Sequence, residues 1–267
     1  MAHVNQFRQL LKEGKPTLGT RLHSMSPLIT EAVGALGKYD YVEFVGEYAP
    51  FDQYGMENLV RAAEVHGMAS MLKLDYQCRG YVAQKAIASG FQGVLFTDLT
   101  TPEQVEECIQ MITPKCPQKG GMMGYAARRW IGFQSFATQD EYIDTVCQTV
   151  KAFMVEKKEA VDNIDEFLSV PGIDLVQFGP NDYAMSSGFN MSENRDAVME
   201  AEKKVILACH NHNIHPCAVL NSAAEAEYYI DLGVKDFSLG LEMRVLQTFL
   251  SKEGDALLNT LAKNGIL

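Results

Sequence analysis

The segment VPGIDLVQF (residues 170–178) contains the kind of junction that decides the fold of this 267-residue chain. A helix-like stretch ends at a glycine, and an apolar run of strand-forming residues begins within a few positions. Glycine suits the left-handed residue that follows a helix end, and an apolar run is typical of a buried strand in a parallel sheet. The junction recurs as ALGKYDYVEFV (35–45), VHGMASMLKL (65–74), ASGFQGVLF (88–96) and DLGVKDFSLG (231–240). Repeated helix–glycine–strand units predict alternating β and α elements around a parallel sheet.

Eight segments read as buried strands, and eight is the number that closes an α/β barrel. They are residues 17–22, 41–45, 69–74, 93–98, 151–156, 175–180, 216–220 and 236–240. We therefore predict an α/β protein with the (β/α)8 (TIM) barrel fold. The alternative, an open doubly wound sheet, predicts a GxGxxG motif after the first strand, and TLGTRLHSMSP has none.

The length suits one barrel domain over residues 1–267, with an insertion at about 99–150 because that stretch is too long for one crossover helix. Long insertions usually lie on the active-site side of a barrel. Arg128, Arg129 and Trp130 in this insertion are therefore candidates for binding a substrate carboxylate or for packing a subunit interface.

The composition predicts a cytoplasmic globular protein. Hydrophobic residues make up 47% of the chain, yet no stretch approaches the ~20 apolar residues of a membrane span. The N-terminus lacks the pattern of a signal peptide. A net charge of −11 disfavours nucleic acid or an anionic membrane as the main partner. Six cysteines without CxxC spacing are expected to be reduced thiols.

Catalytic side chains of such a barrel come from the carboxyl ends of the strands and the loops that follow. The polar residues there are Arg21, His23, Glu47, Tyr48, Lys73, Asp75, Asp98, Glu156, Asn181, Asp182, Asn221 and Ser238. Glu156 and Asp182 follow consecutive strands, which lie about 4.8 Å apart. Two carboxylates there can hold an ion that prefers oxygen ligands, such as Mg²⁺ or Mn²⁺. The competing interpretation is that these acids cap helices or pair with Lys157 and Lys158.

Two motifs around these carboxylates resemble the HpcH/HpaI-type aldolase family of the phosphoenolpyruvate/pyruvate barrel superfamily. The first is Glu156-Lys-Lys-Glu159-Ala160 after the fifth strand, and the second is Gly179-Pro180-Asn181-Asp182 after the sixth. The similarity extends over nearly the whole chain. It implies a homotrimer or homohexamer that uses a divalent metal, Mg²⁺ or Mn²⁺, with Co²⁺ as a further candidate.

The resemblance also assigns roles to residues. Glu156 and Asp182 are implied as the metal ligands. The backbone amides of Asn181 and Asp182, after the turn at Gly179 and Pro180, are implied to receive the carboxylate of a small anionic, pyruvate-type 2-oxo acid. A metal chelated by that acid stabilises an enolate as charge develops, which is a Lewis-acid role.

The sequence departs from the family pattern at the second strand. The family has Asp-Gly-Glu-His there, and its histidine, oriented by the aspartate, moves protons. This chain has Val45-Gly46-Glu47-Tyr48, and tyrosine, with a pKa near ~10, is a poor base. The arginine that ends the family's third strand corresponds to Lys73, and a glutamine before the metal-binding glutamate corresponds to Met154.

Several residues are candidates for the roles that the absent histidine and arginine have in the family. Lys73, Glu47, Tyr48 and His23 are predicted as catalytic residues, and Arg21 joins Gly179, Pro180, Asn181 and Asp182 as predicted substrate-binding residues. A Schiff base between Lys73 and a 2-oxo acid is a separate hypothesis.

The cluster His210-Asn-His212-Asn-Ile-His215 has the look of a metal site. It falls where a long helix ends and before the seventh strand begins, on the face of a barrel that serves stability. Histidines there complement the helix dipole, so we do not expect a metal at this cluster.

We therefore predict a metal-dependent carbon–carbon lyase, similar to class II aldolases, that acts on a pyruvate-type 2-oxo acid through a metal-stabilised enolate. Two alternatives stay open. One is a condensing enzyme or decarboxylase acting on an oxaloacetate-like substrate. The other is a noncatalytic protein that binds a 2-oxo acid.

Overall fold

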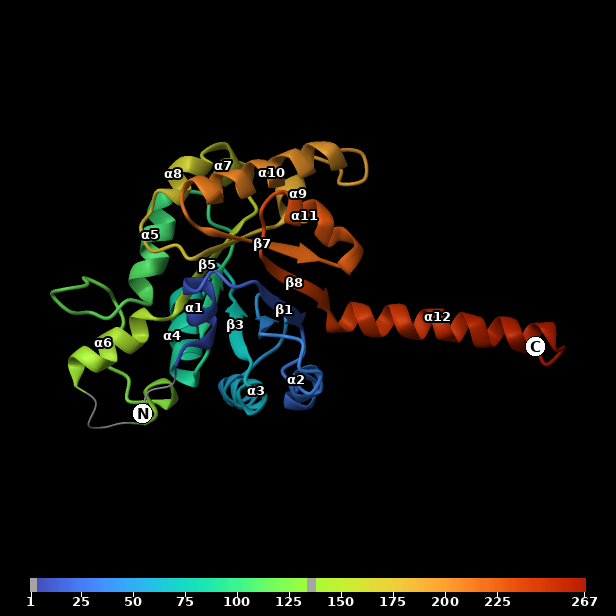
Figure 1. Ribbon diagram of the computed structural model, residues 1–267, viewed down its shortest axis with the longest axis horizontal. Helices are drawn as coiled ribbons and strands as arrows, with labels where there is room; N and C mark the ends of the chain where they lie inside the picture. Colours follow the sequence, from blue (N-terminus) through green and yellow to red (C-terminus); the bar gives the residue numbers. More distant parts are fainter. Residues whose placement is uncertain (1–3, 134–137) are drawn as a thin grey trace.

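The structure is a computed structural model that describes residues 4–133 and 138–267 (Figure 1). Eight parallel strands form a closed barrel in sequence order, and β1 pairs with β8. The strands are β1 (Thr17–Leu22), β2 (Tyr41–Val45), β3 (Ala69–Lys73), β4 (Gly93–Phe96), β5 (Val150–Val155), β6 (Leu175–Phe178), β7 (His215–Leu220) and β8 (Asp236–Leu241). The predicted (β/α)8 fold is confirmed, and the closed order rules out the open sheet.

The helices on the outside follow the strands in turn. They are α2 (Pro27–Gly34), α3 (Gln53–Val65), α4 (Arg79–Ser89), α5 (Pro102–Met111), α6 (Gln139–Cys147), α7 (Lys158–Asp162), α8 (Ile164–Leu168), α9 (Pro180–Ser186), α10 (Arg195–Asn211), α11 (Ala226–Asp231) and α12 (Glu242–Lys263). Local sequence sets the helix starts: Thr101 and Thr138 each form a reciprocal capping box with the residue three positions on. The strand-preceding glycines 37, 67, 90, 172 and 233 all have positive φ, as a helix end requires.

The insertion between β4 and β5 packs against the outside of the barrel. It contains α5, the short 3₁₀ helix η1 (Arg129–Ile131) and α6. Arg128 and Arg129 form ion pairs with Glu57 and Glu64 of α3, and Trp130 is buried. These three residues therefore fasten the insertion to its neighbours. Their ion-pair partners lie on the outer helix layer, so these residues are not at the mouth of the barrel, and their binding of a substrate carboxylate or packing of a subunit interface stays a prediction.

A short N-terminal helix, α1 (Gln6–Lys12), closes the amino-terminal end of the barrel. Phe7 and Leu11 belong to the same buried cluster as Tyr41 and Met71 of the strands, and the rings of Phe7 and Tyr41 stack with centroids 4.5 Å apart. The opposite end, where the strands terminate, is thereby left as the open mouth.

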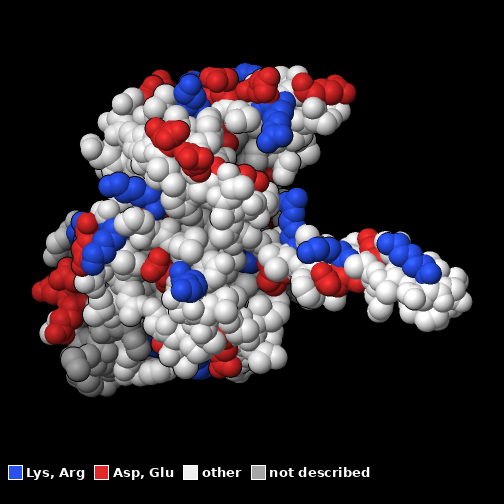
Figure 2. Space-filling view, turned by 45° about the vertical axis from the view of Figure 1, so that its right-hand side comes forward, with Lys and Arg blue, Asp and Glu red and all other residues white. Residues whose placement is uncertain are grey.

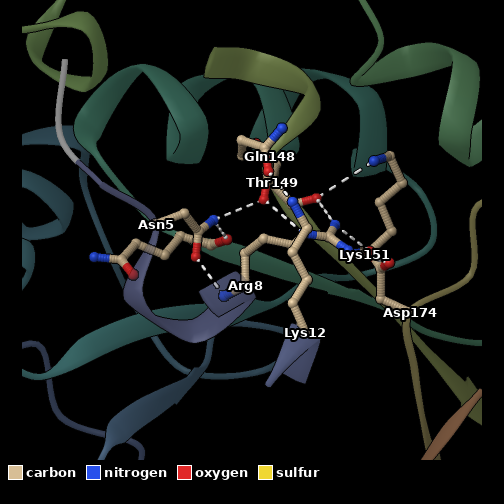
Figure 3. Close-up of polar contacts among 8 residues, drawn as sticks. Asn5, Arg8, Lys12, Gln148, Thr149, Lys151 and Asp174 are labelled. Atoms are coloured by element: carbon tan, nitrogen blue, oxygen red, sulfur yellow. Dashed lines mark hydrogen bonds and ion pairs between the residues drawn. The ribbon is translucent and has the colours of Figure 1, made fainter. Parts of the chain in front are cut away.

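Polar contacts anchor α1 to the strands (Figure 3). Asn5 donates hydrogen bonds to the carbonyls of Gln92 and Gln148, at 2.7 and 2.8 Å. Arg8 forms a bidentate ion pair with Asp174 and donates to the carbonyl of Thr149 at 2.8 Å. Bidentate guanidinium–carboxylate pairs are strong and directional, so this pair fixes α1 against the bottom of the barrel.

We expect Arg8→Ala to lower the free energy of unfolding by about 2–3 kcal/mol, because it removes the cation that pairs with the mostly buried Asp174 carboxylate and leaves that group with a hydrogen bond from the backbone amide of Lys151. Lys12→Ala is the matched control on the same helix, since Lys12 makes one exposed hydrogen bond to Gln148 and should change stability by at most about 0.5 kcal/mol. Urea unfolding of both variants measures the difference. Equal, small effects would show that α1 is not held by Arg8.

Helix α12 stands away from the barrel at the carboxyl terminus (Figure 1). None of its residues is buried, although it carries large apolar side chains that include Met243, Leu246, Phe249 and Leu250. Figure 2 shows it projecting clear of the body, with charged groups and broad uncharged areas along its length. Over the described residues, no helix is long and apolar enough to cross a membrane.

Candidate active site

The mouth of the barrel contains a small cavity of about 190 Å³. Most of the site residues predicted from sequence line it, namely Arg21, His23, Lys73, Glu156, Gly179, Pro180, Asn181 and Asp182. Glu47 and Tyr48 do not, and neither does any described residue of the insertion. A larger groove of about 760 Å³ lies outside, beside α3 and α4, but the mouth is where buried acids and a lysine converge.

Glu156 lies at the centre of this site, directly after β5. Its side chain is buried, and its Oε1 accepts a hydrogen bond of 3.0 Å from the backbone amide of Asp98. Burial, the largest cause, raises the pKa of the Glu156 carboxyl to about 7, although the Lys73 ammonium and the Asp98 amide act in the opposite direction. A strongly perturbed acid in a cleft is a feature of functional sites.

Three carboxylates gather around one point at the mouth. Ligand oxygens of Glu47, Asp98 and Glu156 all lie within 4.8 Å of one another. Asp98 adopts φ 60°, a left-handed conformation that non-glycine residues rarely hold, and this turn aims its amide at Glu156. Asp182 is outside this triplet but lines the same cavity as Glu156. Besides the predicted pair, Glu156 and Asp182, the structure therefore brings the carboxylates of Glu47 and Asp98 to the mouth.

Two lysines neutralise part of this charge. Lys73 Nζ lies 2.5 Å from Oε2 of Glu47, and Lys157 Nζ lies 2.6 Å from Asp98 and 3.7 Å from Asp182. Burial opposes the charge on Lys73, yet Glu156 and Glu47 outweigh it and raise the pKa of its ammonium. The lysine is thus held as a cation, which disfavours the Schiff-base hypothesis.

Gly179 is required for the packing around Glu156. A Cβ atom at residue 179 would lie 2.6 Å from both Cβ and Oε2 of Glu156 and 3.0 Å from Cε of Met154. The amide of Gly179 donates to the carbonyl of Val155 at 3.1 Å, and Pro180 then begins α9. The turn therefore lies directly against the buried carboxylate.

Gly179→Ala should displace the Glu156 side chain and weaken Mn²⁺ binding by at least about tenfold, a loss of about 1.4 kcal/mol. The matched control is Gly254→Ala on α12, where an added Cβ meets nothing within 4 Å and binding should not change. Isothermal titration calorimetry with Mn²⁺ measures both. Unaltered affinity in Gly179→Ala would mean that Glu156 is not held in place by this turn.

The residues at the end of β2, where the sequence departs from the family pattern, differ in their exposure to solvent. Val45 lines the cavity, whereas Tyr48 is 81% exposed. Desolvation of its hydroxyl and the neighbouring Glu47 raise the pKa of Tyr48 to about 12, so it cannot serve as a base at neutral pH. Glu47 is enclosed, with 4% of its side chain exposed, and is paired with Lys73.

The residues after β1 approach the mouth from the other side. Arg21 lines the cavity and donates from Nε to the carbonyl of Gly240 at 3.2 Å. The backbone amides of His23 and Ser24 donate to Glu242 at 2.7 and 2.8 Å. Glu242 is the first residue of α12, so the N-terminus of that helix is hydrogen-bonded to the loop that contains His23.

Sequence reasoning did not select two buried residues of the cavity, Glu43 on β2 and Gln177 on β6. Glu43 is an acid inside an apolar strand. It is two residues before Val45, so both side chains point into the barrel, and this alternation could have identified Glu43 from the sequence. The histidines of residues 210–215 have separate partners, the Leu232 carbonyl, Asp165 and Asp236, and do not converge.

Comparisons with known proteins identify the family. The profile described as HpcH/HpaI aldolase/citrate lyase matches residues 22–247, so the chain belongs to this family of aldolases and lyases. It is 28% identical to the 2-keto-3-deoxy-L-rhamnonate aldolase of Escherichia coli strain K12 over 187 residues, which cover 69% of this chain and 67% of that protein.

Two further proteins are similar over nearly the whole chain. The 4-hydroxy-2-oxovalerate aldolase of Novosphingobium aromaticivorans is 25% identical over 255 residues, covering 95% of this chain and 94% of that protein. The crystal structure of citrate synthase SbnG superposes with a TM-score of 0.82 at 21% identity, covering 99% of this chain and 100% of that one. At this identity the second comparison establishes the shared fold.

Proposed function

We propose that this protein is a divalent-metal-dependent carbon–carbon lyase acting on a pyruvate-type 2-oxo acid. The observation that carries the proposal is the buried Glu156 carboxylate at the mouth, with Glu47 and Asp98 oxygens within 4.8 Å and Asp182 on the same cavity. The family consists of aldolases and lyases, and two relatives named as 2-oxo-acid aldolases support the substrate class.

The donor set fits a hard divalent cation. Carboxylate oxygens are the ligands that Mg²⁺ and Mn²⁺ prefer, and a protein of similar fold, the citrate lyase beta subunit of M. tuberculosis, is known in complex with oxaloacetate and magnesium. Glu156 and Asp182 are the proposed ligands, and Asp98 and Glu47 are close enough to add an oxygen or to orient bound water. A cation held there supplies Lewis-acid polarisation of the substrate's 2-oxo group.

The chain's own groups would bind and orient the acid. Lys73 and Arg21 both line the cavity and bring positive charge to an anionic substrate. The amides of Asn181 and Asp182 lie in the first turn of α9, where backbone N–H groups have no acceptor within the helix. A substrate carboxylate can accept from them.

One experiment distinguishes an enzyme that enolises pyruvate from a noncatalytic protein that only binds a 2-oxo acid. With Mg²⁺, the protein should exchange the methyl protons of pyruvate into D₂O, followed by proton NMR, and chelation should stop the exchange. Absence of exchange despite metal-dependent oxalate binding would favour the noncatalytic alternative. Pyruvate formed from oxaloacetate would indicate a decarboxylase, and oxaloacetate consumed only with an acyl donor would indicate a condensing enzyme.

Metal affinity should depend on pH through Glu156. Its carboxyl has a pKa raised to about 7, so it is protonated below that pH and must lose the proton to bind metal. The apparent affinity for Mn²⁺ should rise about tenfold per pH unit up to about pH 7 and level off above it. Calorimetry between pH 5.5 and 8.5 measures this. A flat profile would contradict the role of Glu156.

We also propose that α12 mediates assembly into the trimer or hexamer that the family resemblance implies. An exposed helix with an apolar stripe and no buried residue is not stable by itself in water. Its apolar side chains need a surface to cover them, and a second copy of the chain offers one.

A further inference from the structure

Glu43 is a buried acid in the wall of the mouth cavity, and the proposed function gives it no role. It lies on β2 with 1% of its surface exposed, and it borders the cavity of about 190 Å³ together with Glu156 and Asp182. In the strand register it stands beside Arg21 of β1. A small acid that is fixed at Glu156 and Asp182 therefore lies in the same enclosed space as the Glu43 carboxylate.

A neutral amide orients this carboxylate. Gln177 Nε2 on β6 donates a hydrogen bond of 2.8 Å to Oε2 of Glu43, and Gln177 is itself buried on the cavity wall. The lysine and the arginine of the cavity have other partners, since Lys73 is paired with Glu47 and Arg21 donates to a backbone carbonyl. Over the described residues, no donor reaches the other oxygen of Glu43, Oε1, so its lone pairs are available to a ligand or to a proton.

The other titratable side chains of the cavity are cations, proposed metal ligands or exposed. They are Arg21, His23, Lys73, Glu156 and Asp182. The arginine does not lose its proton in proteins, and the lysine is held as a cation by its ion pair. The two acids are the proposed metal ligands, and the histidine is exposed on the loop after β1. Among the described residues of the cavity, Glu43 is therefore the buried acid that can exchange a proton with a bound substrate.

We propose that Glu43, oriented by Gln177, is the catalytic residue that moves a proton to and from C3 of the bound pyruvate-type acid. When the enolate forms, the C3–H bond breaks and its proton goes to Oε1 of Glu43. The electron pair of that bond forms the C2–C3 double bond, and the π pair of the 2-oxo group moves to its oxygen. In the reverse step protonated Glu43 returns the proton to C3. This inference rests on the proposed function, because the acid must first be fixed at the metal-binding end of the cavity.

The test measures two quantities on the full-length protein with Mg²⁺: the exchange of pyruvate methyl protons into D₂O by NMR, and the binding of oxalate by calorimetry. Glu43→Gln should lower the exchange rate at saturating pyruvate by at least about 100-fold and change the Kd of oxalate by less than about threefold, because oxalate has no C–H proton to transfer. Glu43→Leu supplies an apolar side chain of the kind that barrel interiors usually contain. It should show the same loss, and it keeps the test decisive if the glutamine variant does not fold. Glu202→Gln on α10 is the control and should leave both quantities unchanged.

A purely structural role for Glu43 predicts a different order of variants. Glutamine matches glutamate in size and still offers an acceptor to Gln177, so it would replace a structural glutamate better than aspartate does. Aspartate keeps a carboxylate, so Glu43→Asp should exchange protons faster than Glu43→Gln if Glu43 carries the proton.

Three results overturn the inference. They are an exchange rate in Glu43→Gln within about tenfold of wild type, a rate in Glu43→Gln equal to or above that of Glu43→Asp, and equal losses of exchange and oxalate affinity. No exchange in wild type rejects the proposed lyase function and this inference with it. Exchange that occurs in wild type and persists in Glu43→Gln rejects only the role of Glu43.

Discussion

Glu156→Gln should abolish the thermal stabilisation that Mg²⁺ and oxalate together give the wild-type protein. A ligand present at about 100 times its Kd stabilises the folded state by about 2.7 kcal/mol, which for a chain of this size raises Tm by about 5–10 °C. The variant removes the buried carboxylate that, in our proposal, provides the principal charge for the cation. Differential scanning fluorimetry with and without Mg²⁺ and oxalate measures the loss.

The same substitution should not destabilise the metal-free protein at high pH. The pKa of Glu156 is raised in the folded state to about 7 from 4.5, so its ionisation costs stability that grows as the pH rises above 4.5 and is complete above about pH 7. Removing the charge should therefore leave Tm at pH 8 equal to or above that of wild type. A lower Tm would mean that Glu156 supports the fold.

The matched control is Glu202→Gln on α10. Glu202 is also a partly buried glutamate, and burial raises its pKa to about 7 as well, but it accepts a hydrogen bond from Tyr229 and does not line the mouth cavity. This variant should keep the full response to Mg²⁺ and oxalate. Loss of the response in both variants would show that it reflects general stability instead of a site at Glu156.

Leu250→Glu should break the assembly that we assign to α12. Leu250 is 59% exposed in the single chain, and a buried unpaired charge at a subunit contact costs several kcal/mol. Light scattering after size exclusion should show the mass falling from a multiple of 29.6 kDa to the mass of one chain.

Lys252→Glu is the control for that measurement. This variant reverses a charge two residues after Leu250. Residue 252 lies on the opposite side of the helix, and the wild-type residue there is already charged. Assembly should survive this change. If Leu250→Glu leaves the mass unchanged, or if wild type is a single chain, α12 does not serve assembly.

The sequence predicted the barrel because its signals are local. The glycines that end the helices and the apolar runs that follow need no knowledge of distant residues, and the strand bounds agree within two positions. The strand-end rule likewise selected Arg21, Lys73, Glu156 and Asp182, which line the mouth cavity, since inward-facing side chains at the carboxyl ends of the strands reach the mouth.

The remaining features depend on tertiary contacts. Asp98 contributes through a left-handed turn that aims its amide at Glu156, and the enrichment of aspartate in left-handed conformations does not by itself locate such a turn. Lys157 lies near Asp182, as the competing interpretation of the sequence allowed, but its shorter ion pair with Asp98 depends on the turn at that residue. The insertion lies on α3 because Arg129 meets Glu64 there, and the general rule about insertions misplaced it.

The most direct test of the central claim is a crystal structure with Mn²⁺ and oxalate, in which the anomalous signal locates the ion. We predict one ion at the mouth, bound by carboxylate oxygens of Glu156 and Asp182 and by oxalate, with Lys157 displaced from Asp182. Manganese bound away from Glu156, or no manganese at the mouth under saturating oxalate, would contradict the account.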